Sequence, residues 1–315
     1  MQAIVQRRYG PPDTLRLEEI ERPEVGDDDV LVRVRAVGIN PADWHMTGGT
    51  PFVARLMFGL RRPKQPVPGT DVAGVVEAVG SNVTAFKPGD EVFGARSGSL
   101  AEYVAGGKNF IPKPANVSFE QAGAVAIAGC TALQGLRDKA HLQSGQRVLI
   151  NGAAGGVGTF AVQIAKSYGA HVTGVCSTRN VEIVRSIGAD AVVDYTAEDF
   201  VRQGQHYDVV LDLVGNRPLS DIRRVLTPKG TAVLIGGEGG IGGLVKTLLL
   251  NLFVGQRLLT FIAKIDRGDL LVLSELMESG KVTPVVDRTY PLNEAPEAMR
   301  YLEAGHARGK VVVTV

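Results

Sequence analysis

The chain has 315 residues, enough for two domains of ordinary size and a large buried core. Its 34 basic and 33 acidic side chains leave a formal net charge of +1. This balance argues against a general nucleic-acid binder, which relies on many Lys and Arg contacts to phosphate. The two cysteines, Cys130 and Cys176, are too few for a disulfide framework and fit a reducing compartment.

Neither the start of the chain nor its most apolar region is typical of a membrane or export signal. The first residues, MQAIVQRRYGPPD, predict a strand and a turn rather than a signal peptide. The apolar region 241–263 is interrupted by polar and charged side chains that a membrane span would bury at high cost: Lys246, Asn251, Gln256 and Arg257. We therefore expect no membrane span and a cytoplasmic protein.

The first hundred residues predict short strands separated by turns. Residues 30–39 alternate apolar and charged side chains, as in a half-buried strand, and residues 72–80 have a strand pattern. Residues 81–92 predict a turn around Pro88-Gly89-Asp90 that leads into another strand. This part of the chain is predicted to be an all-β, barrel-like domain.

The hydrophobic period changes near residue 122. A long packed helix is predicted over 121–139, followed by strands at 147–151, 171–176, 191–195, 207–214, 231–237 and 258–263. Helices are predicted between several of them, at 156–168, 181–187 and 220–226. Six apolar strands that alternate with helices predict an α/β fold with a doubly wound parallel sheet.

The end of the chain resembles its beginning. A helix over 270–279 is followed by the strand-like segments TPVVDRTYPL and GKVVVTV. We therefore predict that residues 1–126 and 265–315 form a substrate-binding and catalytic β domain. Residues 127–264 would form an inserted nucleotide-binding domain.

The sharpest motif is NGAAGGVG at 151–158, which follows a predicted strand and begins a predicted helix. Small residues let the backbone approach a pyrophosphate, and a helix N-terminus offers free amides to it. The pattern G-x-G-x-x-G fits with alanine in place of the first glycine. The alternative is a purely structural turn. The predicted cofactor-binding residues here are Ala153, Gly155, Gly156, Val157 and Gly158.

The segment after the second strand of this sheet indicates the kind of dinucleotide. NAD sites usually place an acidic residue there to bind the ribose 2′-hydroxyl. This chain has Ser177, Thr178 and Arg179, with no acid in sequence until Glu182. Hydroxyls and a guanidinium suit a 2′-phosphate, which predicts NADPH. The alternative is that Arg179 is a solvated surface residue.

Several motifs together resemble one family. PGTDVAGVVEAVG (68–80), NPADW (40–44), AGCTALQGL (128–136), NGAAGGVG and GKVVV (309–313) are similar, in this order, to the zinc-free quinone oxidoreductase (zeta-crystallin-like) branch of the medium-chain dehydrogenase/reductase superfamily. The resemblance covers nearly the whole chain. It implies a GroES-like β-barrel domain and a Rossmann domain with a six-stranded sheet.

Zinc-dependent members of this superfamily bind a catalytic metal through an early Cys, a His-Glu pair and a further Cys or Asp. At the matching positions this chain has Asn40-Pro41 and Thr70-Asp71. Its five histidines show no ligand spacing, and two cysteines cannot form a four-cysteine lobe. We expect no metal.

Without a metal, the predicted reaction is hydride transfer from NADPH to a quinone. Alternatives are NADPH-dependent reduction of an α,β-unsaturated carbonyl (an enone, alkenal or enoyl thioester), or a binding protein without turnover. The expected partner is a small-molecule quinone or conjugated carbonyl. Four cations between residues 51 and 66 could attract acidic substrates or belong to a solvated loop.

Three residues are the candidates for catalysis. The match to the family's Asn-Pro turn suggests that the Asn40 amide orients the nicotinamide or donates to the acceptor, although an Asn that stabilises a turn is an equal alternative. Asp43 is a candidate that could equally support this turn. His45 could donate a proton, but an exposed histidine is the commoner case.

The remaining cofactor candidates lie elsewhere along the chain. The resemblance implies that Thr131 begins a helix facing the cofactor and that Tyr195 lies against the 2′-phosphate. Residues at the carboxyl ends of later strands and a lysine of the last strand complete the set: Val214, Gly236, Gly237 and Lys310. Because the strand at 258–263 is predicted at a sheet edge, we also expect a homodimer.

Overall fold

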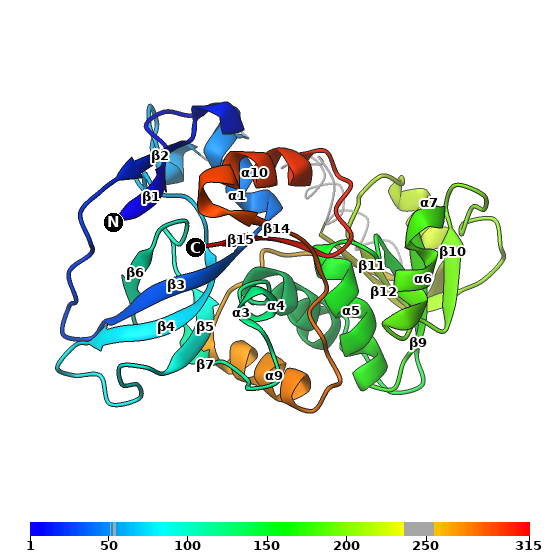
Figure 1. Ribbon diagram of the computed structural model, residues 1–315. Helices are drawn as coiled ribbons and strands as arrows, with labels where there is room; N and C mark the ends of the chain where they lie inside the picture. The colour runs from blue at the N-terminus through cyan, green and yellow to red at the C-terminus, as the bar shows by residue number, and fades with distance from the viewer. Residues whose placement is uncertain (51, 53–54, 236–254) are drawn as a thin grey trace. The chain divides into compact units, whose positions relative to one another are not determined.

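The computed structural model describes residues 1–50, 52, 55–235 and 255–315 (Figure 1). The chain divides into two compact units. Unit 1 comprises Met1–Cys130 and Ile265–Val315, and unit 2 comprises Thr131–Lys264. Within the described ranges, no helix is both long enough and apolar enough to cross a lipid bilayer.

The described strands of unit 1 form a small antiparallel pair and a seven-stranded sheet of order β14-β15-β3-β4-β5-β7, with β6 paired to β3. Their bounds are β1 Gln2–Val5, β2 Arg16–Glu19, β3 Val30–Ile39, β4 Asp71–Val79, β5 Glu91–Ala95, β6 Tyr103–Gly106, β7 Phe110–Pro112, β14 Val286–Pro291 and β15 Lys310–Thr314. The central strand β3 pairs with β15 over its second half and with β6 over its first. The last strand of the chain therefore completes the sheet that the first hundred residues begin.

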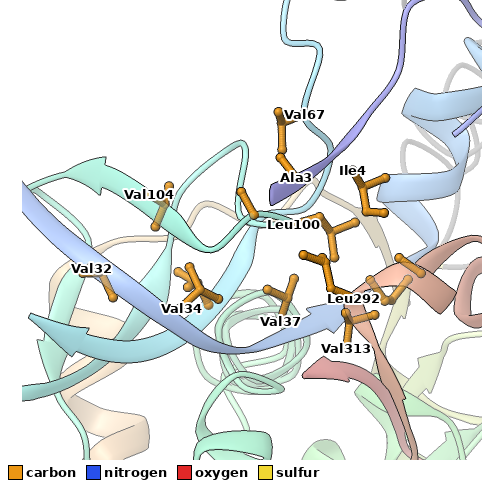
Figure 2. Close-up of a cluster of buried hydrophobic side chains, with 14 of the residues drawn as sticks. Ala3, Ile4, Val32, Val34, Val37, Val67, Leu100, Val104, Leu292 and Val313 are labelled. Carbon is orange, nitrogen blue, oxygen red and sulfur yellow. The ribbon is translucent and has the colours of Figure 1, made fainter. Parts of the chain in front are cut away.

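The core of unit 1 lies against this sheet. Valines of β3 pack with residues from β1, from the segment before β6 and from β15 (Figure 2). Val32, Val37 and Val313 are fully buried. The exposed side chains of Arg33 and Arg35 alternate with buried valines, which explains the alternating sequence pattern. Burial of each such aliphatic side chain contributes roughly 1.5–3 kcal/mol.

The structure adds two helices to the first hundred residues, which were predicted to be all β: α1 Pro41–Gly48 and α2 Arg55–Phe58. Near the end of the chain it has a further helix that was not predicted, α10 Ala295–Glu303. Asn40 is the N-cap residue of α1 and Pro41 occupies its first turn, a common way to begin a helix. The Asn-Pro pair therefore starts a helix rather than only a turn.

The long helix predicted over 121–139 is interrupted. The structure has α3 Phe119–Ala122, α4 Ala126–Gln134 and a π-helical turn, η3 Gly135–Lys139. A Cβ added to Gly123 would lie 2.8 Å from the carbonyl oxygen of Ala36 in β3. The helix breaks because the backbone packs closely against β3 at this glycine. Thr131 consequently lies within α4, not at its start as predicted.

Unit 2 contains a sheet of six described strands in the order β10-β9-β8-β11-β12-β13, and every pairing is parallel. The strands are β8 Arg147–Asn151, β9 His171–Cys176, β10 Ala191–Asp194, β11 Tyr207–Asp212, β12 Leu226–Leu234 and β13 Arg257–Thr260. This is the strand order of a doubly wound dinucleotide-binding sheet. The predicted α/β fold is confirmed.

The helices of unit 2 pack against this sheet. α5 Gly156–Ser167 contacts β8 and β9, α6 Val181–Ser186 contacts β9 and β10, and α7 Leu219–Arg224 contacts β12. In unit 1, α9 Arg267–Glu278 packs near β7. The helix predicted over 220–226 ends earlier because Leu226 already belongs to β12, where it pairs with Tyr207 of β11.

Candidate active site

The glycine-rich turn joins β8 to α5. Gly152 follows β8 directly and has φ of 87°, a left-handed conformation that favours glycine. The amide of Gly155 donates to the carbonyl of Gly152 over 3.0 Å, and Gly155 is the N-cap residue of α5. The turn therefore presents the first amides of a 12-residue helix at the carboxyl end of a central parallel strand.

Gly158 is the position where this turn packs most tightly. A Cβ added there would lie 2.1 Å from the carbonyl oxygen of Gly152 and 2.8 Å from backbone atoms of Ala153. Ala153 itself is buried, and its amide donates to Val175 at the end of β9. Gly152 was not among the predicted residues, although its place directly after a predicted strand marks it as the turn residue.

The segment expected near a 2′-phosphate follows β9. Ser177 precedes the short 3-10 turn η4 Thr178–Asn180, in which Thr178 and Arg179 are exposed. The Thr178 hydroxyl donates to the Asp194 carboxylate over 2.5 Å. Since a hydroxyl has one hydrogen, this bond uses the only hydrogen that the Thr178 side chain can donate.

Asp194 is an acidic residue near this segment that the sequence pattern did not reveal. It ends β10, the strand beside β9, so sheet pairing brings it to Thr178 from 16 residues away. The hydroxyls of Thr178 and Thr196 hold the pKa of this exposed carboxyl below its ordinary value. An ionised carboxylate therefore lies beside the predicted phosphate-binding residues.

The other predicted residues of unit 2 lie at strand ends. The Tyr195 amide donates to the carbonyl of Cys176, which places this exposed tyrosine beside Ser177. A Cβ on Gly152 would lie 2.8 Å from Val214, so Val214 borders the glycine-rich turn. Thr131 is buried in α4. Gly236 and Gly237 lie outside the described residues.

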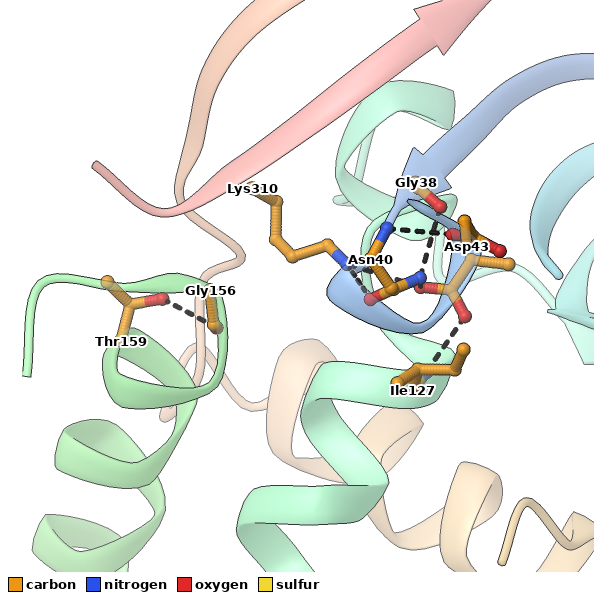
Figure 3. Close-up of polar contacts among 8 residues, drawn as sticks. Gly38, Asn40, Asp43, Ile127, Gly156, Thr159 and Lys310 are labelled. Carbon is orange, nitrogen blue, oxygen red and sulfur yellow. Dashed lines mark hydrogen bonds and ion pairs between the residues drawn. The ribbon is translucent and has the colours of Figure 1, made fainter. Parts of the chain in front are cut away.

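A buried polar cluster occupies unit 1 where β3 ends. The Lys310 ammonium donates to the Asn40 side-chain oxygen over 2.5 Å (Figure 3). It also lies 3.4 Å from Asp71 Oδ2. Asn40 Nδ2 in turn donates to Asp71 Oδ2 and to the carbonyl of Gly38. These side chains are almost fully buried, so each depends on the others to satisfy its charge or polarity.

Asp71 was not among the predicted site residues. It begins β4, and its second oxygen accepts from the amide of Ile127 over 2.9 Å. Burial raises the pKa of its carboxyl, and the nearby Lys310 ammonium opposes that shift. The sequence did contain a signal, because Thr70-Asp71 matches the position of a His-Glu pair in zinc-dependent relatives.

Asp43 lies in the first turn of α1. Its Oδ2 accepts from the Asn40 amide over 2.8 Å, whereas Oδ1 has no partner among the described residues. Burial raises the pKa of this carboxyl to about 7, and the charge of Asp71 adds to the effect. The proton-bearing form of Asp43 therefore persists to near-neutral pH.

His45 does not join this cluster. It is exposed on α1, its ring stacks on Trp44 at 3.8 Å between centroids, and its Nδ1 lies 3.4 Å from the Thr50 hydroxyl. The structure thus brings Asn40, Asp43 and Lys310 together with Asp71, and leaves His45 outside.

The donor set of this cluster does not fit zinc. Zinc sites in proteins use thiolate, imidazole and carboxylate ligands, and here an ammonium already lies between an amide oxygen and a carboxylate. Within the described ranges, no group of three or more His, Cys, Asp or Glu side chains has the arrangement to hold a metal ion. Cys130 and Cys176 are buried, and burial raises the pKa of the Cys176 thiol to about 11.

Comparison with known proteins places the chain in a family. Residues 26–109 match the alcohol dehydrogenase GroES-like domain, and residues 187–313 match a zinc-binding dehydrogenase domain. A chloroplastic NADPH-dependent alkenal/one oxidoreductase of Arabidopsis thaliana is 39% identical over 99% of this chain and 79% of its own length. The chain belongs to the medium-chain dehydrogenase/reductase superfamily. The predicted GroES-like and Rossmann-type parts are both confirmed.

Two further relatives are quinone oxidoreductases. A chloroplastic one from Triphysaria versicolor is 35% identical over 99% of this chain and 98% of its own length. The solved structure of the Escherichia coli quinone oxidoreductase complexed with NADPH has a TM-score of 0.85 and 27% identity, and covers 100% of both chains. This medium-chain protein is therefore an oxidoreductase of the quinone or alkenal reductase type.

Proposed function

We propose that the protein is a zinc-independent, NADPH-dependent oxidoreductase that transfers hydride to a quinone. The observation that carries this proposal is the turn at Gly152–Gly158, where glycines leave the N-terminus of α5 open to a pyrophosphate. Unit 2 would be the cofactor-binding domain and unit 1 the catalytic domain. The relatives named quinone oxidoreductase support the choice of acceptor.

The preference for NADPH depends on Arg179. Its guanidinium is suited to a 2′-phosphate, with Ser177 and Tyr195 as neighbours that could complete the site. Asp194 opposes this preference, because a carboxylate repels a phosphate and can instead accept from a ribose hydroxyl. We therefore expect a preference for NADPH that Asp194 limits.

Within the buried cluster, Asn40 and Lys310 have different hydrogen-bonding groups left for a ligand. Both hydrogens of the Asn40 amide are committed, to Asp71 and to Gly38, so its free capacity is the second lone pair of its oxygen. Asn40 is thus suited to accept from a carboxamide group rather than to donate to a substrate. Lys310 has three donors, of which two face Asn40 and Asp71. The third can donate to a polar ligand.

Bound NADPH supplies the hydride, and a reduced quinone also takes up a proton. Below pH of about 7 Asp43 retains a proton, and the Lys310 ammonium lies 3.4 Å from Asp71 Oδ2. The bonds from Asn40 Nδ2 to Asp71 Oδ2 and to the Gly38 carbonyl hold the Asn40 side-chain amide in one orientation. Asp43 Oδ2 accepts from the Asn40 backbone amide, so Asp43 acts as a positioning residue for Asn40.

Reduction of a carbon–carbon double bond conjugated to a carbonyl is the second candidate. A 2-methylene-furan-3-one reductase from Solanum lycopersicum is 37% identical over 99% of this chain, and the Arabidopsis relative is an alkenal/one oxidoreductase. Such substrates are electron-poor, as a quinone is, and can therefore accept hydride in the same way.

Cofactor oxidation at 340 nm tests the proposal. We expect saturable NADPH oxidation on addition of 1,4-benzoquinone or 9,10-phenanthrenequinone, with slower oxidation by a simple enone. A reversed order would support the second candidate. NADPH binding without oxidation by any of these acceptors would contradict the proposed reaction and favour a protein that only binds the cofactor.

Two variants test the choice of cofactor in the same assay. Arg179→Gln is expected to raise the KM for NADPH roughly 10- to 100-fold, the value of one charge-assisted hydrogen bond, and to leave NADH unaffected. Asp194→Asn is expected to lower the KM for NADPH. A wild-type protein that prefers NADH, or an Arg179→Gln variant that affects both cofactors equally, would contradict the assignment.

A further inference from the structure

One segment of unit 1 exposes an unusual amount of apolar surface. Its large apolar side chains Phe52, Leu56, Phe58 and Leu60 have 66%, 67%, 41% and 55% of their surface exposed. Nine large hydrophobic residues are exposed in the described part of the chain, and these four fall within nine consecutive positions. Exposed apolar side chains gathered in one short segment are typical of an interaction site, whereas single exposed residues are not.

Hydrogen bonds and a ring contact hold residues 55–64 of this segment in place. At the end of α2, the amide of Gly59 donates to the Arg55 carbonyl, and the amide of Lys64 donates to the Phe58 carbonyl, each over 2.8 Å. The Tyr9 hydroxyl donates to the Gly59 carbonyl over 2.6 Å. The Arg55 guanidinium lies 4.5 Å above the Tyr9 ring. The base of the segment is thus anchored to the N-terminal part of unit 1 while its apolar side chains face outward.

The same segment is strongly basic. Residues 51–66 contain four cations and no Asp or Glu, although the whole chain has a net charge of only +1. Arg55 is used in the anchor, through its stacking on Tyr9 and its bond to the Gly49 carbonyl. Arg61, Arg62 and Lys64 are exposed, and none of them is within salt-bridge distance of a carboxylate in the described residues.

We propose that this apolar-basic patch docks the protein on an anionic membrane surface. The four apolar side chains would enter the boundary between headgroups and acyl chains, and the three cations would bind lipid phosphates and carboxylates. A second copy of the chain fits less well. A symmetric contact would bring Arg61, Arg62 and Lys64 against their own copies without a compensating anion.

Vesicle co-sedimentation tests the charged half of the patch. The wild-type protein, without cofactor, is mixed with phosphatidylcholine vesicles that contain either no anionic lipid or about 30 mol% phosphatidylserine. We expect binding to the anionic vesicles, weakened by added salt. The variant R61Q/R62Q/K64Q is expected to bind roughly 100-fold more weakly. The control K87Q/K229Q/K281Q removes the same charge from exposed lysines elsewhere and is expected to bind like the wild type.

A second variant tests the apolar half. F52S/L56S/L60S keeps all the cations and is expected to bind anionic vesicles at least about tenfold more weakly. Thermal unfolding of each variant verifies that it is folded. The proposal is overturned if the wild type does not bind anionic vesicles, or if the charge-matched control loses as much binding as R61Q/R62Q/K64Q. It is also overturned if the wild type does not bind vesicles and F52S/L56S/L60S changes the protein from a dimer to a monomer, because the patch would then be a contact between two copies of the chain.

Discussion

The carboxyl group of Asp43 has one oxygen that accepts a hydrogen bond and one that has no partner in the described residues. Sequence alone could nominate Asn40 and Asp43, because both stand in a recognisable Asn-Pro motif. It could not predict the unpaired oxygen, nor the role of Asp71, which lies 31 residues away in sequence from Asn40. Pairing of β3 with β4 and of β3 with β15 brings these residues together.

This environment predicts how stability changes with pH. Asp43 ionises near pH 3.8 in an unfolded chain but near 7 when folded. Because the folded pKa is the higher one, the folded state is favoured at low pH, and this advantage is lost as pH rises from about 4 to about 7. Between pH 5 and pH 8, the wild type should therefore lose roughly 2–3 kcal/mol relative to Asp43→Asn, which does not titrate.

Urea unfolding of both proteins at pH 5, 6, 7 and 8 measures this difference. The free energies of the two proteins should diverge up to about pH 7 and then run parallel. Parallel curves over the entire range would show that Asp43 has an ordinary pKa in the folded protein.

At the scale of elements, the sequence predicted the parallel strands well because each is a short apolar run between turn residues. The predicted strands 147–151 and 171–176 coincide with β8 and β9. Elements with a weaker pattern were missed: α10 buries only Ala295, Ala298 and Met299 on one face of a largely polar segment. The break at Gly123 could not be predicted either, since it results from contact with β3.

The turn before α5 gives a prediction at this scale. Gly158→Ala adds a methyl group 2.1 Å from the Gly152 carbonyl oxygen, whereas the same change at Gly155 meets only that oxygen, at 3.4 Å. Gly158→Ala should therefore lower stability by roughly 1–3 kcal/mol, as overpacking does, despite the better helix propensity of alanine. Gly155→Ala should cost less than about 1 kcal/mol.

Thermal unfolding of the two glycine variants makes the comparison, and NADPH fluorescence titration adds a second readout for the variant at 158. Because the backbone must move to admit the new methyl group at 158, its NADPH affinity should fall as well. Equal stability of the two variants would mean that the turn is looser than the structure indicates.

For the molecule as a whole, the alternation of strands and helices was enough to predict a doubly wound sheet, and the β-rich ends predicted a second unit with a different architecture. What the pattern could not supply is the chemistry that depends on neighbouring strands. Asp194 illustrates this limit, because it looks remote from Thr178 in sequence but lies beside it at the ends of β9 and β10. The preference for a cofactor is therefore harder to predict than the cofactor-binding fold.

The edge of the unit 2 sheet predicts the assembly of the molecule. β13 is the last described strand of that sheet, and Ile262, just beyond it, has 93% of its surface exposed. An edge strand can pair with the same strand of a second copy, which predicts a homodimer of about 67 kDa from chains of 33.4 kDa. The double variant Thr260→Lys and Ile262→Lys should be a monomer, since a symmetric contact would place four new charges together. Light scattering decides between these masses: a wild type of one-chain mass would refute the dimer, and a variant that stays dimeric would show that the contact lies elsewhere.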